Sequence, residues 1–345
     1  MISIIIPVFN RKTLVAETLD SILSQTHCDW ECIVVDDRST DGSIDVVAQY
    51  VERDSRVRLF IRPESRTKGA ASCRNIGYEN SRGEFVYFFD SDDLLNPAFL
   101  AAVHREMQSY PMAEYATFCY SNFIEVPTIP VRRTRKYDPK RGPLFDQIIT
   151  NRLQANTPNF FWKRSLFDKV RVLWREELQY GDDTDFVCRM ICHADRGVWL
   201  DMPDLVYVRR HPDSMGGKGK GEKMKCVEDR VQIFRYIYDY CTQMGRMSSS
   251  LHSGYLCHIL RIQAINTLLY GDRSVSRYFE RLLKALVCRT FGDKRILFFS
   301  RCLTLGAPVL RVCADIAILL RIPWLSQRLV LHGVNSMPDK SFGIN

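Results

Sequence analysis

The first hundred residues alternate between short, largely apolar runs and amphipathic stretches. Each apolar run has the length of a strand buried on both faces, and the runs comprise residues 3–6, 30–35, 57–61 and 85–89. From Leu14 to Leu23, apolar side chains recur at three- and four-residue spacing, which predicts a helix with one buried face. Another helix is expected to open at the small residues 69–72. Strands that alternate with helices predict an α/β fold, with a mainly parallel sheet flanked by helices and ligands bound beyond the carboxyl ends of its strands.

The pattern changes in the second half of the chain. Residues 126–136 are rich in proline and arginine, which favours an exposed ribbon, either a cover for an acceptor or a solvated connector. Residues 216–223 are rich in glycine and lysine and suit a loop, whose Lys218 and Lys220 either close over phosphates or stay solvated. From about Val227 the pattern is helical throughout. We therefore expect two parts, a sheet-containing ligand-binding domain over residues 1–225 and a mainly helical region over residues 226–345.

The composition is that of a globular protein. Hydrophobic residues make up 46% of the chain and charged residues 26%, which argues against a disordered chain and against a multi-span membrane protein. Residues 1–7 lack the basic segment and long apolar core of a secretory signal, so we expect a cytoplasmic protein. Free thiols are then expected for the 12 cysteines. Cys188 and Cys192 are predicted to be small buried hydrophobes rather than zinc ligands.

The net charge of +8 is concentrated near the C-terminus. Residues 273–328 hold eleven Lys or Arg and three acids, so this stretch accounts for the whole excess. No uncharged run there reaches the roughly 18 to 20 residues that span a bilayer. Two interpretations stay open. Basic amphipathic helices could lie on the anionic inner face of the cell membrane, or a helical subdomain could pack on the sheet-containing domain or on a second copy of the chain.

Acidic side chains follow two of the predicted strands. Asp36 and Asp37 end the second strand, and Asp90, Asp92 and Asp93 follow the fourth. Because the carboxyl ends of parallel strands meet at one edge of a sheet, we expect both clusters at one crevice. Closely spaced carboxylates are tolerated when a cation neutralises them, and hard oxygen ligands suit Mg²⁺ or Mn²⁺ with a diphosphate as co-ligand. No Gly-x-Gly-x-x-Gly follows the first strand, which argues against a dinucleotide-binding dehydrogenase.

Four segments resemble, in order, the signature blocks of family-2 glycosyltransferases. They are residues 4–10 (IIIPVFN), 34–42 (VVDDRSTDG), 69–77 (GAASCRNIG) and 83–93 (GEFVYFFDSDD). The resemblance covers about residues 1–215 and is strongest in the first hundred. It implies a GT-A fold and a hexosyltransferase-like enzyme that moves a sugar, with inversion, from a nucleotide-sugar donor to an acceptor hydroxyl. A UDP-sugar would be the donor, and the acceptor a glycan or glycolipid of the cell surface.

The resemblance assigns roles at the nucleotide end of the donor. Pro7 and Phe9 would line the pocket for the base, and Asp37 would hydrogen-bond the base, most often uracil. Arg74 would be the cation beside the base or the diphosphate. Asp36 is expected to cap the chain locally rather than to bind the donor.

At the sugar-phosphate end, the resemblance places Asp90 at the ribose, with Ser91 beside it in the donor site. Asp92 would bind the metal ion, Mn²⁺ or Mg²⁺, together with Asp90. His211, in a segment that resembles a further family block, would reach the metal or the diphosphate. Asp93 is expected to make supporting hydrogen bonds.

A third acidic cluster, at residues 182–185, resembles the Glu-Asp block with which a helix of this family begins. The second acid of that block is the usual catalytic base, which makes Asp183 the candidate and Asp182, where Glu is commoner, the alternative. A carboxylate that removes a proton from the acceptor hydroxyl contributes typically about 10² to 10⁴ in rate. A metal ion would stabilise the charge that develops on the departing diphosphate. Asp185 is expected to support the start of the helix.

Other functions account for only parts of the pattern. A polyprenyl-phosphate sugar synthase shares the fold but would be favoured by transmembrane helices. A nucleotidyltransferase would carry a glycine-rich basic loop after its first strand, where residues 7–10 stand instead, and a glycoside hydrolase would need a matched carboxyl pair around an ordinary glycosidic bond. A non-catalytic nucleotide-binding or interaction protein of this fold would not need Asp90, Asp92 and Asp183 together.

Overall fold

The computed structural model describes residues 1–124, 127, 132–150, 153–170, 172–178, 181–202, 204–210, 233, 235–248 and 251–252. The chain divides into two compact units, Met1–Met247 and Ser248–Asn345, and the described residues lie almost wholly in the first. His211, Lys218, Lys220 and the basic stretch 273–328 lie outside the described residues, so the roles given to them stay predictions. The domain boundary after residue 225 likewise falls within a segment that is not described and stays a prediction.

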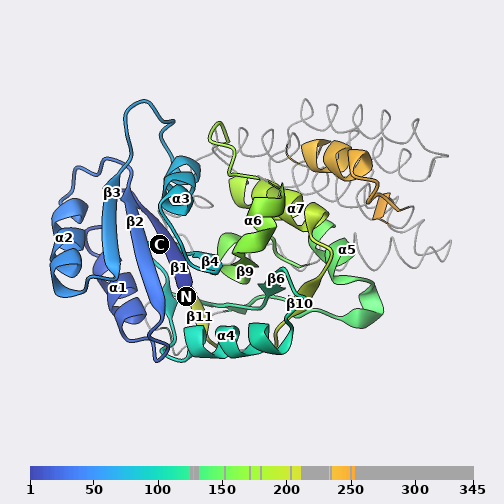
Figure 1. Ribbon diagram of the computed structural model, residues 1–345, viewed down its shortest axis with the longest axis horizontal. Coiled ribbons are helices and arrows are strands. Elements are labelled where there is room, and N and C mark those ends of the chain that lie inside the picture. The colour runs from blue at the N-terminus through green and yellow to red at the C-terminus, as the bar shows by residue number, and fades with distance from the viewer. Residues whose placement is uncertain are drawn as a thin grey trace, which may run out of the picture. The chain divides into compact units, whose positions relative to one another are not determined.

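The first unit is built on a seven-stranded sheet of order β10-β6-β9-β4-β1-β2-β3 (Figure 1). Four adjacent strands of this sheet run parallel to one another, and each coincides with one of the four predicted apolar runs. They are β1 (Ile2–Val8), β2 (Trp30–Asp36), β3 (Val57–Ile61) and β4 (Phe85–Phe88). In the register of the sheet, Ile5 of β1 lies opposite Ile33 of β2 and Phe88 of β4. The predicted α/β architecture with a mainly parallel sheet is confirmed.

The sheet continues with an antiparallel strand that the sequence pattern did not predict. β9 (Phe160–Lys163) runs antiparallel to both β4 and β6 (Tyr115–Thr117), and β10 (Gly197–Trp199) is parallel to β6. A second sheet has the order β5-β11-β7-β8. Its strands are β5 (Leu94–Leu95), β7 (Ser121–Phe123), β8 (Arg132–Arg133) and β11 (Val206–Arg209).

Helices cover the large sheet because alternate side chains of each strand point to opposite faces. Ile4, Cys32 and Val34 pack with Leu19 and Val47 in one core, whereas Ile33 and Val35 pack with Cys73 and Ile76 in a second core. The helices are α1 (Val15–Leu23), α2 (Ser43–Arg53), α3 (Ala70–Glu79), α4 (Phe99–Ser109), α5 (Leu144–Ile149), α6 (Arg164–Val170) and α7 (Asp182–His193). Single 3-10 turns occupy Pro139–Arg141 and Thr157–Asn159.

The arginine-rich ribbon is tied to the rest of the unit by ion pairs. Arg133 lies 2.5 Å from a carboxylate oxygen of Asp204, and Nζ of Lys136 lies 2.7 Å from one of Asp201. Its residues 132–133 also pair with β7 as a strand. Both interpretations of the segment, a cover for an acceptor and a solvated connector, stay predictions.

The cysteines of the described residues are all free, as predicted. Cys188 and Cys192 are buried on α7, and Sγ of Cys192 lies 2.9 Å from Sγ of Cys241. In the part of the chain that the structure describes, no helix is long and apolar enough to cross a membrane.

The close approach of α3 to β1 gives a test of the packing. A Cβ added at Gly77 would lie 2.3 Å from Cγ2 of Ile5. Gly77→Ala should therefore lower the free energy of unfolding by about 1 to 3 kcal/mol, because overpacking outweighs the gain in helix propensity. Urea denaturation measures this change. The control Ala70→Ser, at the exposed first residue of α3, should shift it by less than about 0.5 kcal/mol; equal effects of the two variants would show that α3 and β1 separate without strain.

Candidate active site

The carboxyl ends of β1, β2 and β4 lie at one edge of the large sheet, as the sequence predicted. Val8 at the end of β1 pairs with Asp36 at the end of β2, and the amide of Asp37 donates to the carbonyl of Val8 at 2.7 Å. The amide of Phe89, which follows β4, donates to the carbonyl of Ile5 at 2.9 Å. The strand-end acids after β2 and β4 are thereby carried to the same edge.

Asp36 and Asp37 have different partners. The carboxylate of Asp36 accepts hydrogen bonds from the amide (2.7 Å) and the hydroxyl (2.6 Å) of Ser39, so it shapes the turn after β2, in line with the predicted capping role. Asp37 is buried and accepts a hydrogen bond from Nε of Arg62. Sequence reasoning missed Arg62. Its position directly after the third strand was the available signal, because that is where a parallel sheet places ligand-binding side chains.

Phe9 lies next to these residues in the chain and keeps 39% of its surface exposed. Nζ of Lys68 lies 4.2 Å from the centroid of its ring, within the range of a cation–π contact. The following residue, Asn10, adopts a φ of 50°, and its side chain accepts a hydrogen bond from the amide of Thr40 at 2.9 Å. The ring of Phe9 is thus exposed beside Lys68, the Asn10 side chain contacts the turn after β2, and Pro7 is half-buried within β1.

The acids after β4 differ in exposure. The side chain of Asp90 is 38% exposed and that of Asp92 is 18% exposed, whereas Ser91 is buried. Nε of Arg11 lies 3.4 Å from a carboxylate oxygen of Asp92. Asp93 is buried, and its pKa is raised well above the usual range by burial first and then by the charges of Asp92 and Asp90.

Asp93 stabilises the acidic turn that follows β4. Its carboxylate accepts the amide of Arg209 at 2.9 Å, and Nε of Arg209 donates to the carbonyl of Asp92 at 3.0 Å. Arg209 belongs to β11, so the second sheet holds the acidic turn in place. The supporting role expected for Asp93 agrees with these contacts.

Asp90 and Asp92 provide the kind of ligands that Mg²⁺ or Mn²⁺ prefers. Such ions are usually bound by one or two carboxylates together with phosphate oxygens and water. Burial first, and then the charges of Asp92 and Asp90, raise the pKa of Asp93, so a cation at this turn would reduce the second of these two effects. Among the described residues, no three His, Cys, Asp or Glu side chains form a group that could hold a metal ion by themselves. By their chemistry, the carboxylates of Asp90 and Asp92 suit the one or two protein ligands that such a metal ion usually has.

Arg74 of α3 connects the acidic turn to α7. Its buried guanidinium donates from Nη2 to Asp90 (2.8 Å) and from Nη1 to Asp182 (2.9 Å). The guanidinium carbon also lies 4.4 Å from the centroid of the Trp174 ring. The sequence pointed to Arg74 as a cation of the site but not to its two carboxylate partners, which lie 16 and 108 residues further along the chain.

The first turn of α7 holds the candidate base. Gly181 precedes it with a φ of 70°, a conformation that glycine adopts without strain. Burial and, next, the charge of Asp182 raise the pKa of Asp183 to about 7. Asp182 also has a raised pKa because of burial, which the charge of Arg74 opposes. Asp185 is fully buried and lies 2.6 Å from Nη2 of Arg189, which gives it the structural role that was expected.

Comparison with known proteins identifies a matching family model and related sequences. Residues 3–171 match the model of glycosyl transferase family 2. The uncharacterized glycosyltransferase EpsJ of Bacillus subtilis is 28% identical over 227 residues, which cover 62% of this chain and 62% of EpsJ. An uncharacterized glycosyltransferase of Haemophilus influenzae is 40% identical over 95 residues, which cover 28% of this chain and 37% of that protein. The matches thus span less than two thirds of these relatives' own lengths.

A solved structure has the same fold. The crystal structure of S. aureus TarS 1–349 in complex with UDP-GlcNAc has a TM-score of 0.56 and 17% sequence identity, over 88% of this chain and 90% of that chain. At this identity the likeness shows the fold alone, and it agrees with the predicted GT-A architecture. The family match, the relatives and the fold lead to one conclusion: residues 3–171 of this chain are of the glycosyl transferase family 2 type.

Proposed function

We propose that the chain transfers a sugar from a UDP-sugar to an acceptor hydroxyl with inversion at the anomeric carbon. The observation that carries the proposal is the buried Arg74, which bridges Asp90 at the sheet edge and Asp182 at the start of α7. The bridge supports a site in which the candidate base, next to Asp182 in the chain, works together with the acids that would hold the donor. A proton acceptor and a diphosphate site within one crevice are what direct displacement at the anomeric carbon requires.

Asp183 is the proposed base. As the acceptor oxygen attacks the anomeric carbon, its proton passes to the carboxylate of Asp183, and the bond between the sugar and the diphosphate breaks. A pKa of about 7 suits this task, because a general base works best when its pKa lies near the operating pH. Asp182 is less suited, since its carboxylate is already paired with Arg74.

The nucleotide is proposed to bind at the ends of β1 and β2. Phe9 and Pro7 would stack along the base, and Asp37, held in place by Arg62, would accept a hydrogen bond from a ring N–H of uracil. The exposed ring of Phe9 supports this assignment. The bound UDP-GlcNAc of TarS is a further reason to favour a uridine nucleotide.

The diphosphate end is proposed to lie at the turn after β4. Asp90 and Ser91 would face the ribose, and Asp92, with Asp90, would hold Mn²⁺ or Mg²⁺. His211, outside the described residues, would be a further ligand. When bound, the metal supplies positive charge to the diphosphate as it departs. Arg74 and Arg11 add fixed positive charge beside Asp90 and Asp92.

The acceptor is proposed to be a glycan or glycolipid of the cell surface, as the family resemblance implies. A polyprenyl-phosphate acceptor and a non-catalytic nucleotide-binding role remain the alternatives. Transfer of radiolabelled sugar by the purified protein would exclude the non-catalytic role, and incorporation into a polyprenyl phosphate rather than a saccharide would favour the lipid acceptor.

The nucleotide can be tested with a panel of sugar donors. In the presence of MnCl₂, UDP-sugars should raise the unfolding temperature of the wild-type protein. At a concentration of one hundred times Kd, the free energy of unfolding should increase by about 2.7 kcal/mol. GDP-, CDP- and ADP-sugars at the same concentration should produce smaller shifts. A larger shift with another nucleotide would replace uridine in the proposal.

The metal site can be tested with Asp92→Asn. This variant should lose the Mn²⁺-dependent part of UDP binding, at least about tenfold in Kd, because one of two proposed carboxylate ligands becomes neutral. Isothermal calorimetry with UDP, with and without EDTA, measures the effect. Glu17→Gln, which removes an exposed acid paired with Arg209, is the matched control and should leave binding unchanged. Equal, EDTA-insensitive binding by wild type and Asp92→Asn would remove Asp92 from the metal site.

The base can be tested with Asp183→Asn. We expect kcat to fall by about 10² to 10⁴, with little change in UDP affinity, because the proton acceptor acts in the chemical step. Asp182→Asn should reduce kcat less. If the two variants ranked in the opposite order, Asp182 would be the base. In the wild type, kcat should rise with pH through about 7, because the base must be deprotonated.

The raised pKa of Asp183 also predicts that stability falls as pH rises, whereas kcat is expected to rise. A carboxyl whose folded pKa of about 7 exceeds its ordinary value of 3.8 stabilises the fold when protonated, and this contribution is lost as pH rises between those values. Asp183→Asn should therefore unfold at a higher temperature than wild type at pH 8, and the gap should narrow toward pH 4. A gap that stayed constant with pH would contradict the raised pKa.

A further inference from the structure

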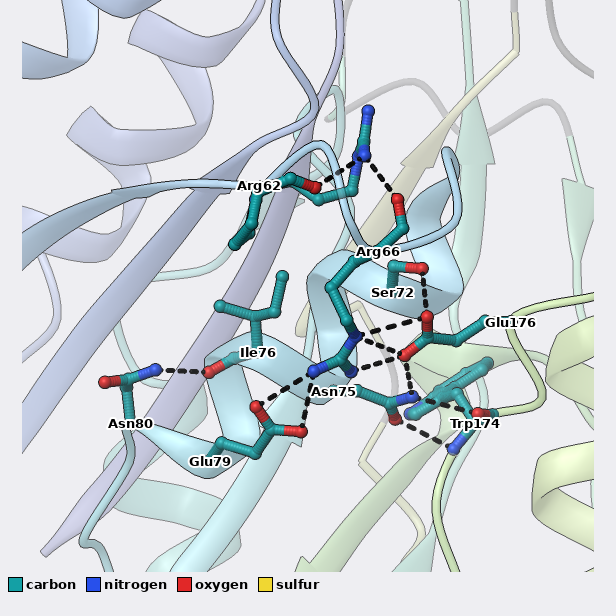
Figure 2. A network of polar contacts seen from close by, with 10 residues as sticks. Arg62, Arg66, Ser72, Asn75, Ile76, Glu79, Asn80, Trp174 and Glu176 are labelled. Atoms are coloured by element: carbon teal, nitrogen blue, oxygen red, sulfur yellow. Dashed lines mark hydrogen bonds and ion pairs between the residues drawn. The ribbon is translucent and has the colours of Figure 1, made fainter.

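The carboxylate of Glu176 gathers hydrogen bonds from two separate parts of the chain (Figure 2). It accepts from Nε of Arg66 at 3.0 Å and from the Arg66 Nη2 group, from the hydroxyl of Ser72 at 2.8 Å, and from Nδ2 of Asn75 at 3.0 Å. Burial opposes its charge, but the hydrogen bonds from Arg66, Asn75 and Ser72 prevail and lower the pKa of Glu176 to about 2. Glu176 is therefore a permanently charged anchor between α3 and residues 172–178.

Residues 172–178 precede α7 closely in the sequence, and their described contacts reach that helix. The side chain of Asn75 holds Trp174 by its backbone, donating to its carbonyl and accepting from its amide, both at 2.9 Å. The ring of Trp174 in turn stacks on Phe186 of α7, with centroids 4.2 Å apart and planes 9° apart. Phe186 lies one helical turn after Asp183. A shift of residues 172–178 would therefore move Trp174 against Phe186 and displace the first turn of α7.

The other partner of Glu176 belongs to the loop that supports the proposed base pocket. The carbonyl of Arg66 accepts a hydrogen bond from Nη1 of Arg62 at 2.6 Å, and Nε of the same Arg62 holds Asp37. Lys68 of this loop contacts Phe9. Glu176 thus joins two segments. One is the loop of Arg66 and Lys68, which contacts the proposed nucleotide-binding residues, and the other is residues 172–178, which precede the candidate base in the sequence.

We propose that Glu176 is a positioning residue that sets α7, and with it Asp183, against the donor half of the site. The inference rests on the proposed function for its catalytic consequence. A base displaced by about 1 Å can lose up to a hundredfold in rate, so a shift of this segment would be felt in the chemical step. UDP binding would be kept, because Arg62 still holds Asp37 when Glu176 is neutral.

Glu176→Gln tests this role, because it keeps the size of the side chain and removes its charge. We expect kcat to fall by about tenfold or more, while the Kd for UDP in MnCl₂, measured by calorimetry, changes by less than about threefold. Glu176→Asp, which restores the charge on a shorter side chain, should recover part of kcat. A merely structural residue would instead lower the folded fraction and change both quantities together.

Glu79→Gln is a matched control. Its carboxylate contacts the same Arg66, at 3.2 Å, but is 43% exposed, and the contacts described for it do not extend to residues 172–178. We expect its kcat to stay within about twofold of wild type. An unchanged kcat in Glu176→Gln, or an equal loss in Glu79→Gln, would overturn the proposal.

Hydrogen–deuterium exchange gives a second readout that does not depend on activity. Amides of residues 173–189 should exchange faster in Glu176→Gln than in wild type or Glu79→Gln, because the anchor of this segment is weakened. If the wild type transferred no sugar from any donor, the proposed function would fail, yet exchange would still decide whether Glu176 positions α7. Identical exchange in the three proteins would overturn the positioning role.

Discussion

The site depends on the burial of one positive charge. A guanidinium removed from water is strongly unfavourable unless it is paired and hydrogen-bonded, and within the described part of the chain Arg74 forms its ion pairs with Asp90 and Asp182. These two carboxylates come from the sheet edge and from α7. The fold can therefore keep Arg74 buried only when the start of α7 lies against the end of β4. One electrostatic requirement assembles two halves of the site that are far apart in the sequence.

A single guanidinium does not neutralise all the acids around it. Asp182 and Asp183 share the start of α7, and Asp90, Asp92 and Asp93 share the turn after β4. The remaining negative charge, added to burial, raises the pKa values of Asp183 and Asp93. Two relieving events are chemically available, protonation and the binding of a cation, and both belong to the proposed reaction. Burial and the neighbouring like charge thus bring the pKa of Asp183 into the range that the proposed general base needs.

Much of the fold was predictable because it rests on local patterns. The parallel strands fall on continuous apolar runs, and Asp37 and Asp90 follow those runs directly, so their meeting at one edge needed no knowledge of distant contacts. Arg62, Trp174 and Glu176 were missed. Their roles come from contacts such as Glu176 with Arg66, across 110 residues, and no local period encodes where the chain returns to α3. The position of Glu176, six residues before an acidic helix start, was the only signal.

The unpredicted direction of β9 explains how the chain returns. Lys163 at the end of β9 pairs with Phe85 at the start of β4, so β9 delivers the chain to the amino edge of the sheet, opposite the site. There, the amide of Arg164 donates to the carbonyl of Glu84 at 2.7 Å and α6 begins. Further along the chain, Asp182 at the start of α7 contacts Arg74 at the carboxyl edge. A parallel β9 would have ended at the carboxyl edge, and α6 would have carried the chain away from it. The antiparallel strand is therefore what allows a residue more than a hundred positions from Arg74 to complete the site.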